Sequence, residues 1–167
     1  GRIAQAVAQK AHFGFGMEVS FYDPYPPSDE IIKKFSAKKF NTLEDVLKDS
    51  DYVTLHCPGG GDNINLMNKE RFALMKKSAF LINTARGDVV DETALVQALK
   101  DDVIAGAGLD VYAKEPVVTE ELLSMNNVVL IPHLGSATTE TRVAMGLRSL
   151  ANVKAFFDGK EPGDRVA

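Results

Sequence analysis

Three side chains with the chemistry of acid–base catalysis follow apolar stretches of the sequence: Arg86, Glu115 and His133. A guanidinium binds a carboxylate through two parallel hydrogen bonds, so Arg86 can orient a substrate carboxylate. Glu115 can hold the His133 ring, and its charge would raise the pKa of that imidazole. If the three side chains converge in one crevice, they support proton transfer beside a hydride carrier. The ordinary alternatives are an arginine in a surface ion pair, a solvated loop carboxylate and a structural histidine.

The start of the chain carries part of a dinucleotide-binding pattern, G-x-G-x-x-G/A, in which Gly1 and Ala4 fit the last two small positions. A glycine there lets backbone amides approach a pyrophosphate at a helix N-terminus. Asp23 ends the next apolar run, where a carboxylate binds the hydroxyls of the adenosine ribose. The first glycine of the pattern and the strand before it are absent, so the alternative is an Ala-rich helix followed by a turn aspartate.

Other candidate residues have simpler explanations. Cys57 stands before a proline at the end of an apolar run, which favours packing near a cofactor over a nucleophile that would need a partnered base. Residues 59–62 (GGGD) lack the Lys-Ser/Thr of a phosphate loop and are expected to form a flexible loop. Asp110 ends another apolar run, where a helix cap is the alternative role. His12 and His56 have no partners at metal-ligand spacing, so we expect no metal site.

An alternation of strand and helix patterns must position these side chains. Helical spacing of apolar residues predicts helices, and short apolar, β-branched runs predict strands. The expected helices are residues 2–12, 42–47, 68–74, 91–99 and 138–157, and the expected strands are 17–22, 51–56, 79–84, 103–111 and 128–131. Residues 35–40 are ambiguous. The alternation is typical of βαβ units around a parallel sheet covered on both faces, and such sheets bind ligands at the carboxyl ends of their strands.

Composition limits the classes to which the chain can belong. Its 167 residues, 45% hydrophobic and 25% charged, are typical of one folded domain, or of one domain and a piece of another. The net charge of −4 argues against a nucleic-acid surface, and no apolar run approaches the roughly 20 residues of a membrane helix. A single cysteine allows no internal disulfide, which favours the cytoplasm. The start at Gly1, without a signal-peptide layout, suggests a piece of a longer protein.

Several segments together resemble the D-isomer-specific 2-hydroxyacid dehydrogenases. They are GRIA, FYDP, LHCP, NTARGDVVDETAL, AGLDVYAKEP and IPHLGSAT, in the order of the family and over nearly the whole chain. The resemblance implies an α/β fold with a Rossmann-type doubly wound parallel sheet that lacks its first strand. We therefore expect an N-terminally truncated NAD-binding domain at residues 1–137. Residues 138–167 are expected to be a return helix and tail that lead to a largely absent substrate domain.

The resemblance also implies a role for individual residues. Arg86 resembles the substrate-binding arginine of the family, His133 its catalytic acid/base, and Glu115 the carboxylate partner of that histidine. Asp110 stands where the family has a residue near the nicotinamide carboxamide, and Asp23 where it binds the adenosine ribose. The other expected cofactor contacts, besides Arg86 and His133, are Gly1, Arg2, Ile3, Cys57, Pro58, Thr84, Ala85 and Gly135.

The implied reaction is the reduction of a 2-keto acid, in which hydride moves from the nicotinamide to C2 and His133 donates a proton to the carbonyl oxygen. Asp23 favours NAD over NADP because a carboxylate repels a 2′-phosphate. The tail, AFFDGKEPGDRVA, is similar to bacterial glyoxylate/hydroxypyruvate reductases. The resemblance implies a homodimeric parent whose partner is a small 2-keto or 2-hydroxy acid, with no nucleic acid and no membrane.

Two other functions fit the same residues. A non-catalytic NAD-sensing partner, like the transcriptional corepressors of the family, would keep Arg86, Glu115 and His133. A bare structural fragment would bind nothing. If the protein is the enzyme, the incomplete dinucleotide-binding pattern and the absent part of the substrate domain predict that this chain alone is a poor catalyst or none.

Overall fold

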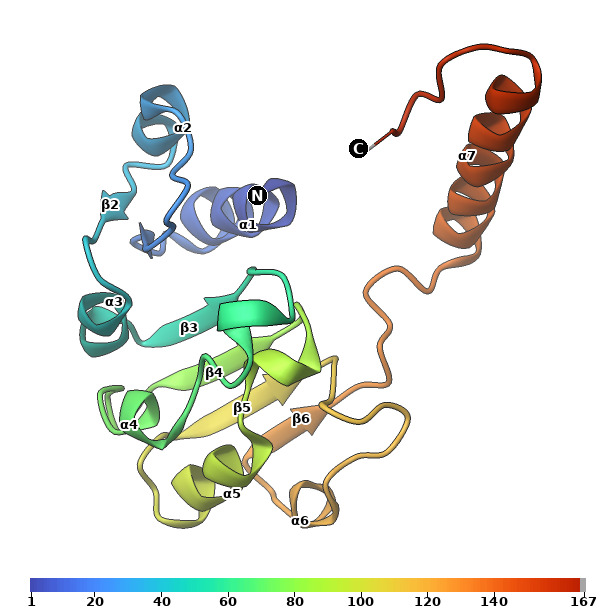
Figure 1. The fold of residues 1–167 in the computed structure, drawn as a ribbon. Coiled ribbons are helices and arrows are strands. Elements are labelled where there is room, and N and C mark those ends of the chain that lie inside the picture. The colour runs from blue at the N-terminus through green and yellow to red at the C-terminus, as the bar shows by residue number, and fades with distance from the viewer. Residues whose placement is uncertain (166–167) are drawn as a thin grey trace. The chain divides into compact units, whose positions relative to one another are not determined.

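The computed structural model describes residues 1–165 and divides the chain into two compact units, Gly1–Pro132 and His133–Ala167. The strands that the structure describes all belong to the first unit (Figure 1). The second unit contains helix α7 (Thr139–Phe157) and the segment that follows it. The domain boundary expected after residue 137 stays a prediction.

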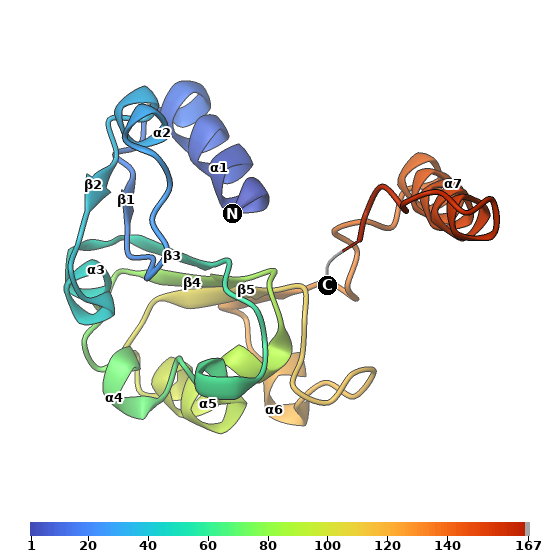
Figure 2. The same ribbon diagram turned by 45° about the horizontal axis from the view of Figure 1, so that its top comes forward.

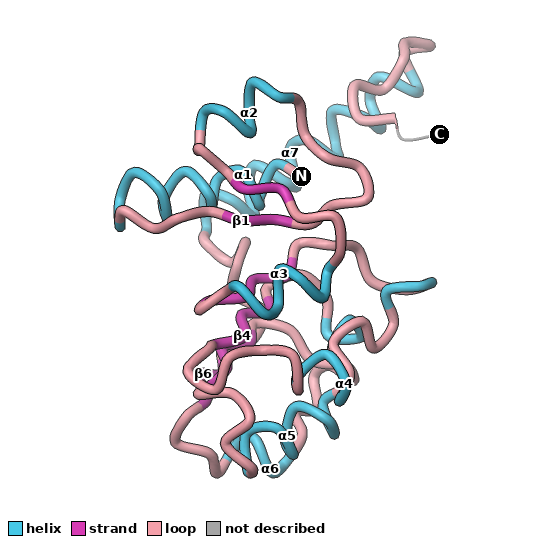
Figure 3. The backbone as a smooth tube through the Cα atoms, turned by 90° about the vertical axis from the view of Figure 1, so that its left-hand side faces the viewer, coloured by secondary structure: helices cyan, strands magenta, loops and turns pink. Residues whose placement is uncertain are grey.

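All strand pairs of the first unit are parallel. The larger sheet has four strands in chain order: β3 (Tyr52–Leu55), β4 (Phe80–Asn83), β5 (Gly106–Leu109) and β6 (Val128–Leu130). A separate pair is formed by β1 (Ser20–Phe21) and β2 (Lys38–Lys39), which lies apart from the larger sheet (Figure 3). Parallel neighbours that follow one another in the chain need crossover connections, as in βαβ units. The expected α/β fold with a parallel sheet is confirmed.

Three helices cover one face of the larger sheet (Figure 2): α4 (Lys69–Phe72), α5 (Glu92–Lys100) and α6 (Glu120–Leu123). α5 turns Leu95, Ala98 and Leu99 inward, at the helical spacing that predicted its buried side. Between these helices and the sheet lies the core, whose largest fully buried apolar side chains are Phe72, Leu47, Met67, Leu81, Leu95, Ile104, Leu122 and Val89.

The remaining α-helices of the first unit precede β3. They are α1 (Arg2–Gln9), which continues into a π-helical turn at Lys10–Gly14, α2 (Asp29–Lys34) and α3 (Leu43–Asp49). α2 and α6 were not expected, because helices of 6 and 4 residues contain too few turns to show an apolar period.

Side-chain caps fix the starts of several helices. The side chains of Thr42, Asn68 and Asp91 each accept a hydrogen bond from the backbone N–H three residues later, and so begin α3, α4 and α5. A side chain that satisfies one of the unpaired N–H groups of a first turn makes that residue the boundary of the helix. The helices expected at 42–47, 68–74 and 91–99 are confirmed, with ends that differ by a few residues.

The opposite face of the larger sheet is only partly covered. Tyr52 and Phe80 stack on it with ring centroids 5.5 Å apart, and 56% and 37% of their surfaces are exposed. α1 lies on this side (Figure 2), but none of its residues is buried. The expectation of a sheet covered on both faces is therefore wrong for the described residues. Along β3 exposed and buried side chains alternate, which is the pattern of a sheet with one covered face.

β1 is also shorter than the strand expected at residues 17–22. Its only partner among the described residues is β2, which is two residues long, so the ladder holds only Ser20 and Phe21. The ambiguous stretch 35–40 supplies this partner.

In the second unit an ion pair joins helix α7 to the tail. Thr138 caps α7 by accepting a hydrogen bond from the Thr141 amide. Arg148 donates two hydrogen bonds of 2.5 and 2.6 Å to Asp164 in the tail, and this pairing holds the pKa of Asp164 at about 2.

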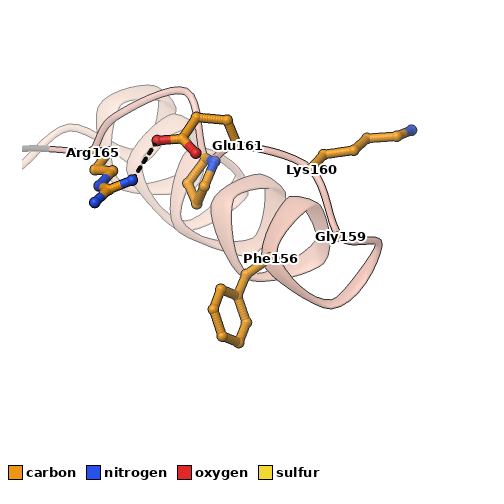
Figure 4. Close-up of a pocket in the computed structure, with 6 residues that line it drawn as sticks. Phe156, Gly159, Lys160, Glu161 and Arg165 are labelled. Carbon is orange, nitrogen blue, oxygen red and sulfur yellow. Dashed lines mark hydrogen bonds and ion pairs between the residues drawn. The ribbon is translucent and has the colours of Figure 1, made fainter.

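A hollow of about 520 Å³ lies between the end of α7 and the tail (Figure 4). It is lined by Phe156, Gly159, Lys160, Glu161, Pro162 and Arg165, and so contains no predicted site residue.

The cap of α5 gives a test of this fold. Replacing Asp91 by Ala removes the acceptor of the Ala94 amide and is expected to lower the free energy of unfolding by about 1 kcal/mol. The measurement is urea denaturation followed by circular dichroism. Asp91→Asn, which keeps an acceptor oxygen, should unfold close to the native chain; equal losses in both variants would contradict the capping role.

Candidate functional site

The site is built on one edge of the larger sheet. Because its strands are parallel and in register, their carboxyl ends lie together at that edge. The segments that follow them are residues 56–61 after β3, 84–91 after β4 and 110–119 after β5. Most of the predicted site residues belong to these segments, so the fold brings together side chains that are far apart in the sequence.

A buried amide shapes the turn that presents Arg86. Asn83, the last residue of β4, is 1% exposed. Its side-chain NH2 donates to the Arg86 carbonyl at 2.9 Å, and its Oδ1 accepts from the Ala85 amide at 3.0 Å. Its backbone carbonyl accepts from the amide of Asp110 at 2.9 Å. The turn is therefore fixed from inside the sheet, and Thr84 and Arg86 are left exposed.

The guanidinium of Arg86 is available at this edge. Its Nη1 donates to the Ala85 carbonyl at 2.6 Å. Within residues 1–165 the ion pairs of the structure involve other arginines and lysines, so the alternative of a surface ion pair does not describe Arg86. An exposed guanidinium with donors to spare can bind an anion.

Gly87 lets the second and third segments touch. A Cβ at this position would lie 1.9 Å from the Tyr112 carbonyl carbon and 2.5 Å from the Ala113 nitrogen, so only a residue without a side chain fits. The backbone beside Arg86 is thereby packed directly on the segment that carries Glu115. Sequence reasoning gave Gly87 no role.

Hydrogen bonds hold the segment after β5. Glu115 is exposed, and its Oε1 accepts from the Tyr112 amide at 3.1 Å. Glu92, at the start of α5, accepts from the Ala113 amide at 2.7 Å and from the Thr119 hydroxyl. The alternative of a freely solvated Glu115 loop is therefore not what the structure contains.

Tyr112 joins this segment to the end of β6. Its buried hydroxyl donates to the Ile131 carbonyl at 2.9 Å and lies 3.3 Å from the Leu109 carbonyl. Burial, together with the charge of the buried Asp110, raises the pKa of Tyr112, so the phenol stays protonated and able to donate. Ile131 is two residues before His133.

The start of the chain lies near the end of β3. Burial lowers the pKa of His56, the residue that follows β3. α1 begins at Arg2 with no side-chain cap on its first amides, and Arg2 and Ile3 are exposed. Unpaired amides at a helix start favour an anion, which suits a pyrophosphate.

Asp23 and Cys57 occupy half-buried positions. Asp23 Oδ1 accepts a hydrogen bond from the Tyr25 amide at 2.8 Å, just after β1. Burial raises the pKa of the Cys57 thiol, and the charge of Asp88 adds to that effect. A thiol that resists ionisation is a poor nucleophile, so packing is the better role for Cys57. Pro58 beside it is exposed.

His133 and Gly135 belong to the second unit. His133 is its first residue and adopts φ 55°, in the left-handed region that non-glycine residues rarely enter. Backbone strain of this kind clusters at functional sites. The convergence of His133 with Arg86 and Glu115 stays a prediction.

Residues 1–165 contain no group of histidine, cysteine and carboxylate side chains able to hold a metal ion. Within the same residues no helix combines the length and the apolar character needed to cross a membrane.

Known proteins resemble this chain closely. Residues 1–135 match the sequence model of the D-isomer specific 2-hydroxyacid dehydrogenase, NAD binding domain. A glyoxylate reductase of Thermococcus kodakarensis is 49% identical over 97% of this chain and 48% of its own length. A glyoxylate/hydroxypyruvate reductase B of Erwinia tasmaniensis is 45% identical over 96% of this chain and 50% of its own length.

A solved structure gives the same fold. The NADPH-dependent glyoxylate/hydroxypyruvate reductase of Sinorhizobium meliloti, in complex with NADP and malonate, superposes with a TM-score of 0.93 and 36% identity. The match covers 100% of this chain and 50% of that one. The chain thus spans about half the length of the relatives it matches.

The close approach at Gly87 can be tested directly. Gly87→Ala places a methyl group against the Tyr112–Ala113 peptide and is expected to lower the free energy of unfolding by about 3 kcal/mol, since backbone must shift to admit it. Gly146→Ala, in α7 with nothing within 4 Å, is the matched control and should leave the stability unchanged or raise it. Denaturant titration of both variants gives the comparison, and equal stabilities would contradict the close packing.

Proposed function

Because the chain belongs to the D-isomer specific 2-hydroxyacid dehydrogenase family, we propose that the protein is an oxidoreductase that interconverts a 2-keto acid and a 2-hydroxy acid with a nicotinamide cofactor. Glyoxylate and hydroxypyruvate are the proposed substrates, since relatives that match nearly the whole chain are reductases of these acids by name. The observation that carries the proposal is the exposed Arg86 guanidinium, held at the sheet edge by the buried Asn83 turn.

The residues at this edge suit a dinucleotide. The uncapped amides at the start of α1 favour the pyrophosphate, and the Asp23 carboxylate after β1 suits the ribose hydroxyls. Cys57, Pro58, Thr84, Ala85, Asp110 and Gly135 are proposed to line the same cleft. When bound, the nicotinamide supplies the hydride that reaches C2 of the keto acid.

The chain's own side chains then bind the acid and move the proton. Arg86 binds the substrate carboxylate through paired hydrogen bonds and so fixes C2 in position. His133 donates a proton to the carbonyl oxygen as the hydride arrives at C2, and the product is the 2-hydroxy acid. Glu115 orients the imidazole and stabilises its protonated form.

We propose NAD rather than NADP as the cofactor. The half-buried Asp23 would repel a 2′-phosphate, although the related reductase from Sinorhizobium meliloti is NADPH-dependent. A homodimeric parent in the cytoplasm stays part of the proposal.

The cofactor proposal is tested by titrating NADH into the 167-residue chain and following the nicotinamide fluorescence. Asp23→Ala is expected to weaken NADH binding about tenfold, through loss of a charge-assisted hydrogen bond of about 1.5 kcal/mol, and to leave NADPH binding equal or tighter. Glu18→Ala removes an exposed carboxylate from the same stretch and should change neither. Absence of NADH binding at millimolar concentration would instead support a structural fragment.

The substrate proposal is tested by steady-state kinetics of the protein that carries this chain. Arg86→Ala is expected to lower kcat/KM for glyoxylate about 100-fold, since about 3 kcal/mol of paired, charged hydrogen bonding is lost. Arg86→Lys keeps the charge but loses the paired geometry, so it should recover only part of the activity. Full activity in Arg86→Ala would refute the role.

A further inference from the structure

The loop of residues 59–61 is fastened to the segment that carries Arg86. The Gly60 amide donates to Asp88 Oδ2 at 2.8 Å. Gly59 packs on the same segment, because a Cβ there would lie 2.5 Å from Asp88 Oδ1 and 3.1 Å from both Cβ and Cγ of Arg86. The loop therefore touches the aliphatic stem of Arg86, and the Asp88 carboxylate holds it there.

Glycine suits this loop for two different reasons. Gly60 and Gly61 have φ of 76° and 53°, which side chains rarely allow. At Gly59 a methyl group would press on the side chains of Arg86 and Asp88, which would have to shift to admit it. The expectation of a merely flexible loop is therefore wrong: the three glycines permit a defined contact.

The chain beyond the loop is tied to the same segment by its backbone. The Asn65 amide donates to the Asp88 carbonyl at 2.8 Å, and the Met67 amide donates to the Val89 carbonyl at 2.9 Å. These bonds do not depend on the Asp88 side chain. Removing the carboxylate should thus free residues 59–61 and leave the path from Asn65 onward in place.

We propose that Asp88 is a positioning residue, whose carboxylate clamps the glycine loop on the stem of Arg86 and so restricts the orientation of the guanidinium. The contact between the glycine loop and Asp88 is present within the chain. The effect of this contact on substrate binding rests on the proposed function of Arg86.

The clamp is tested by the reactivity of Cys57, which is the single cysteine of the chain and precedes the loop by two residues. Asp88→Ala is expected to speed the labelling of Cys57 by a disulfide reagent at pH 8 about tenfold. Without the carboxylate, the loop is no longer held beside the half-buried thiol. The pKa of Cys57 also falls when the charge of Asp88 is lost, and this increases the thiolate fraction. Labelling over a range of pH separates the shift in pKa from the gain in access.

Two variants separate the hydrogen bond from the charge. Asp88→Asn keeps an acceptor for the Gly60 amide and should raise the rate only about twofold. Asp62→Ala, an exposed carboxylate in the next turn of the chain, should leave it unchanged. Unchanged labelling in Asp88→Ala would overturn the clamp. If Asp88→Ala unfolds, Gly59→Ala provides the test, because it displaces the loop while Asp88 remains. The clamp then requires that Cys57 is labelled faster in Gly59→Ala than in the native chain.

The effect on Arg86 needs a kinetic comparison. In the protein that carries this chain, Asp88→Ala is expected to raise KM for glyoxylate about tenfold while kcat and the Kd for NADH change less than twofold, and Asp88→Asn should restore most of the loss. An unchanged KM with a more reactive Cys57 would refute the positioning role but keep the clamp. Absence of 2-keto acid reduction by the native protein would refute the proposed function and the positioning role with it, while the labelling still decides the clamp.

Discussion

The site depends on the burial of one amide, that of Asn83. A polar group so deep in an apolar sheet must find hydrogen-bond partners, and it finds them in the turn that follows. These bonds shape residues 84–86 into a turn directly after β4. Arg86 is therefore lifted from the end of a buried strand to the surface, and its charge keeps access to water or to an anion.

The other segments at this edge are attached to that turn. Gly87 lies against the peptide that leads to Glu115, and Glu92 holds the same segment from the start of α5. The Tyr112 hydroxyl extends the connections to Ile131. The segment after each strand thus contacts the segment after the neighbouring strand. Backbone contacts and buried hydrogen-bond donors fix these segments, more than the exposed side chains do.

Sequence patterns predicted the main strands and helices because apolar spacing and capping residues are local signals, as at Thr42 and Asp91. The same patterns predicted wrongly where a distant segment determines the structure. The length of β1 is limited by its short partner β2, and the exposure of Tyr52 depends on which elements cover that face of the sheet. The candidate residues of the strand ends could be named from their position. Asn83, Gly87 and Asp88 could not, since their roles arise from contacts across segments. The signals available were an amide that ends a buried strand and a glycine directly after Arg86.

The contact between Gly59 and Asp88 has a consequence for how this protein can change over generations. The nearest atom to a side chain at position 59 would be Oδ1 of Asp88. Which residues are tolerated at position 59 therefore depends on the residue at position 88. Substitutions at the two positions should therefore be non-additive, and the order in which they arise would decide whether each is accepted. A divergent copy of this domain would accept a bulkier residue at position 59 more readily once the aspartate after β4 had been replaced.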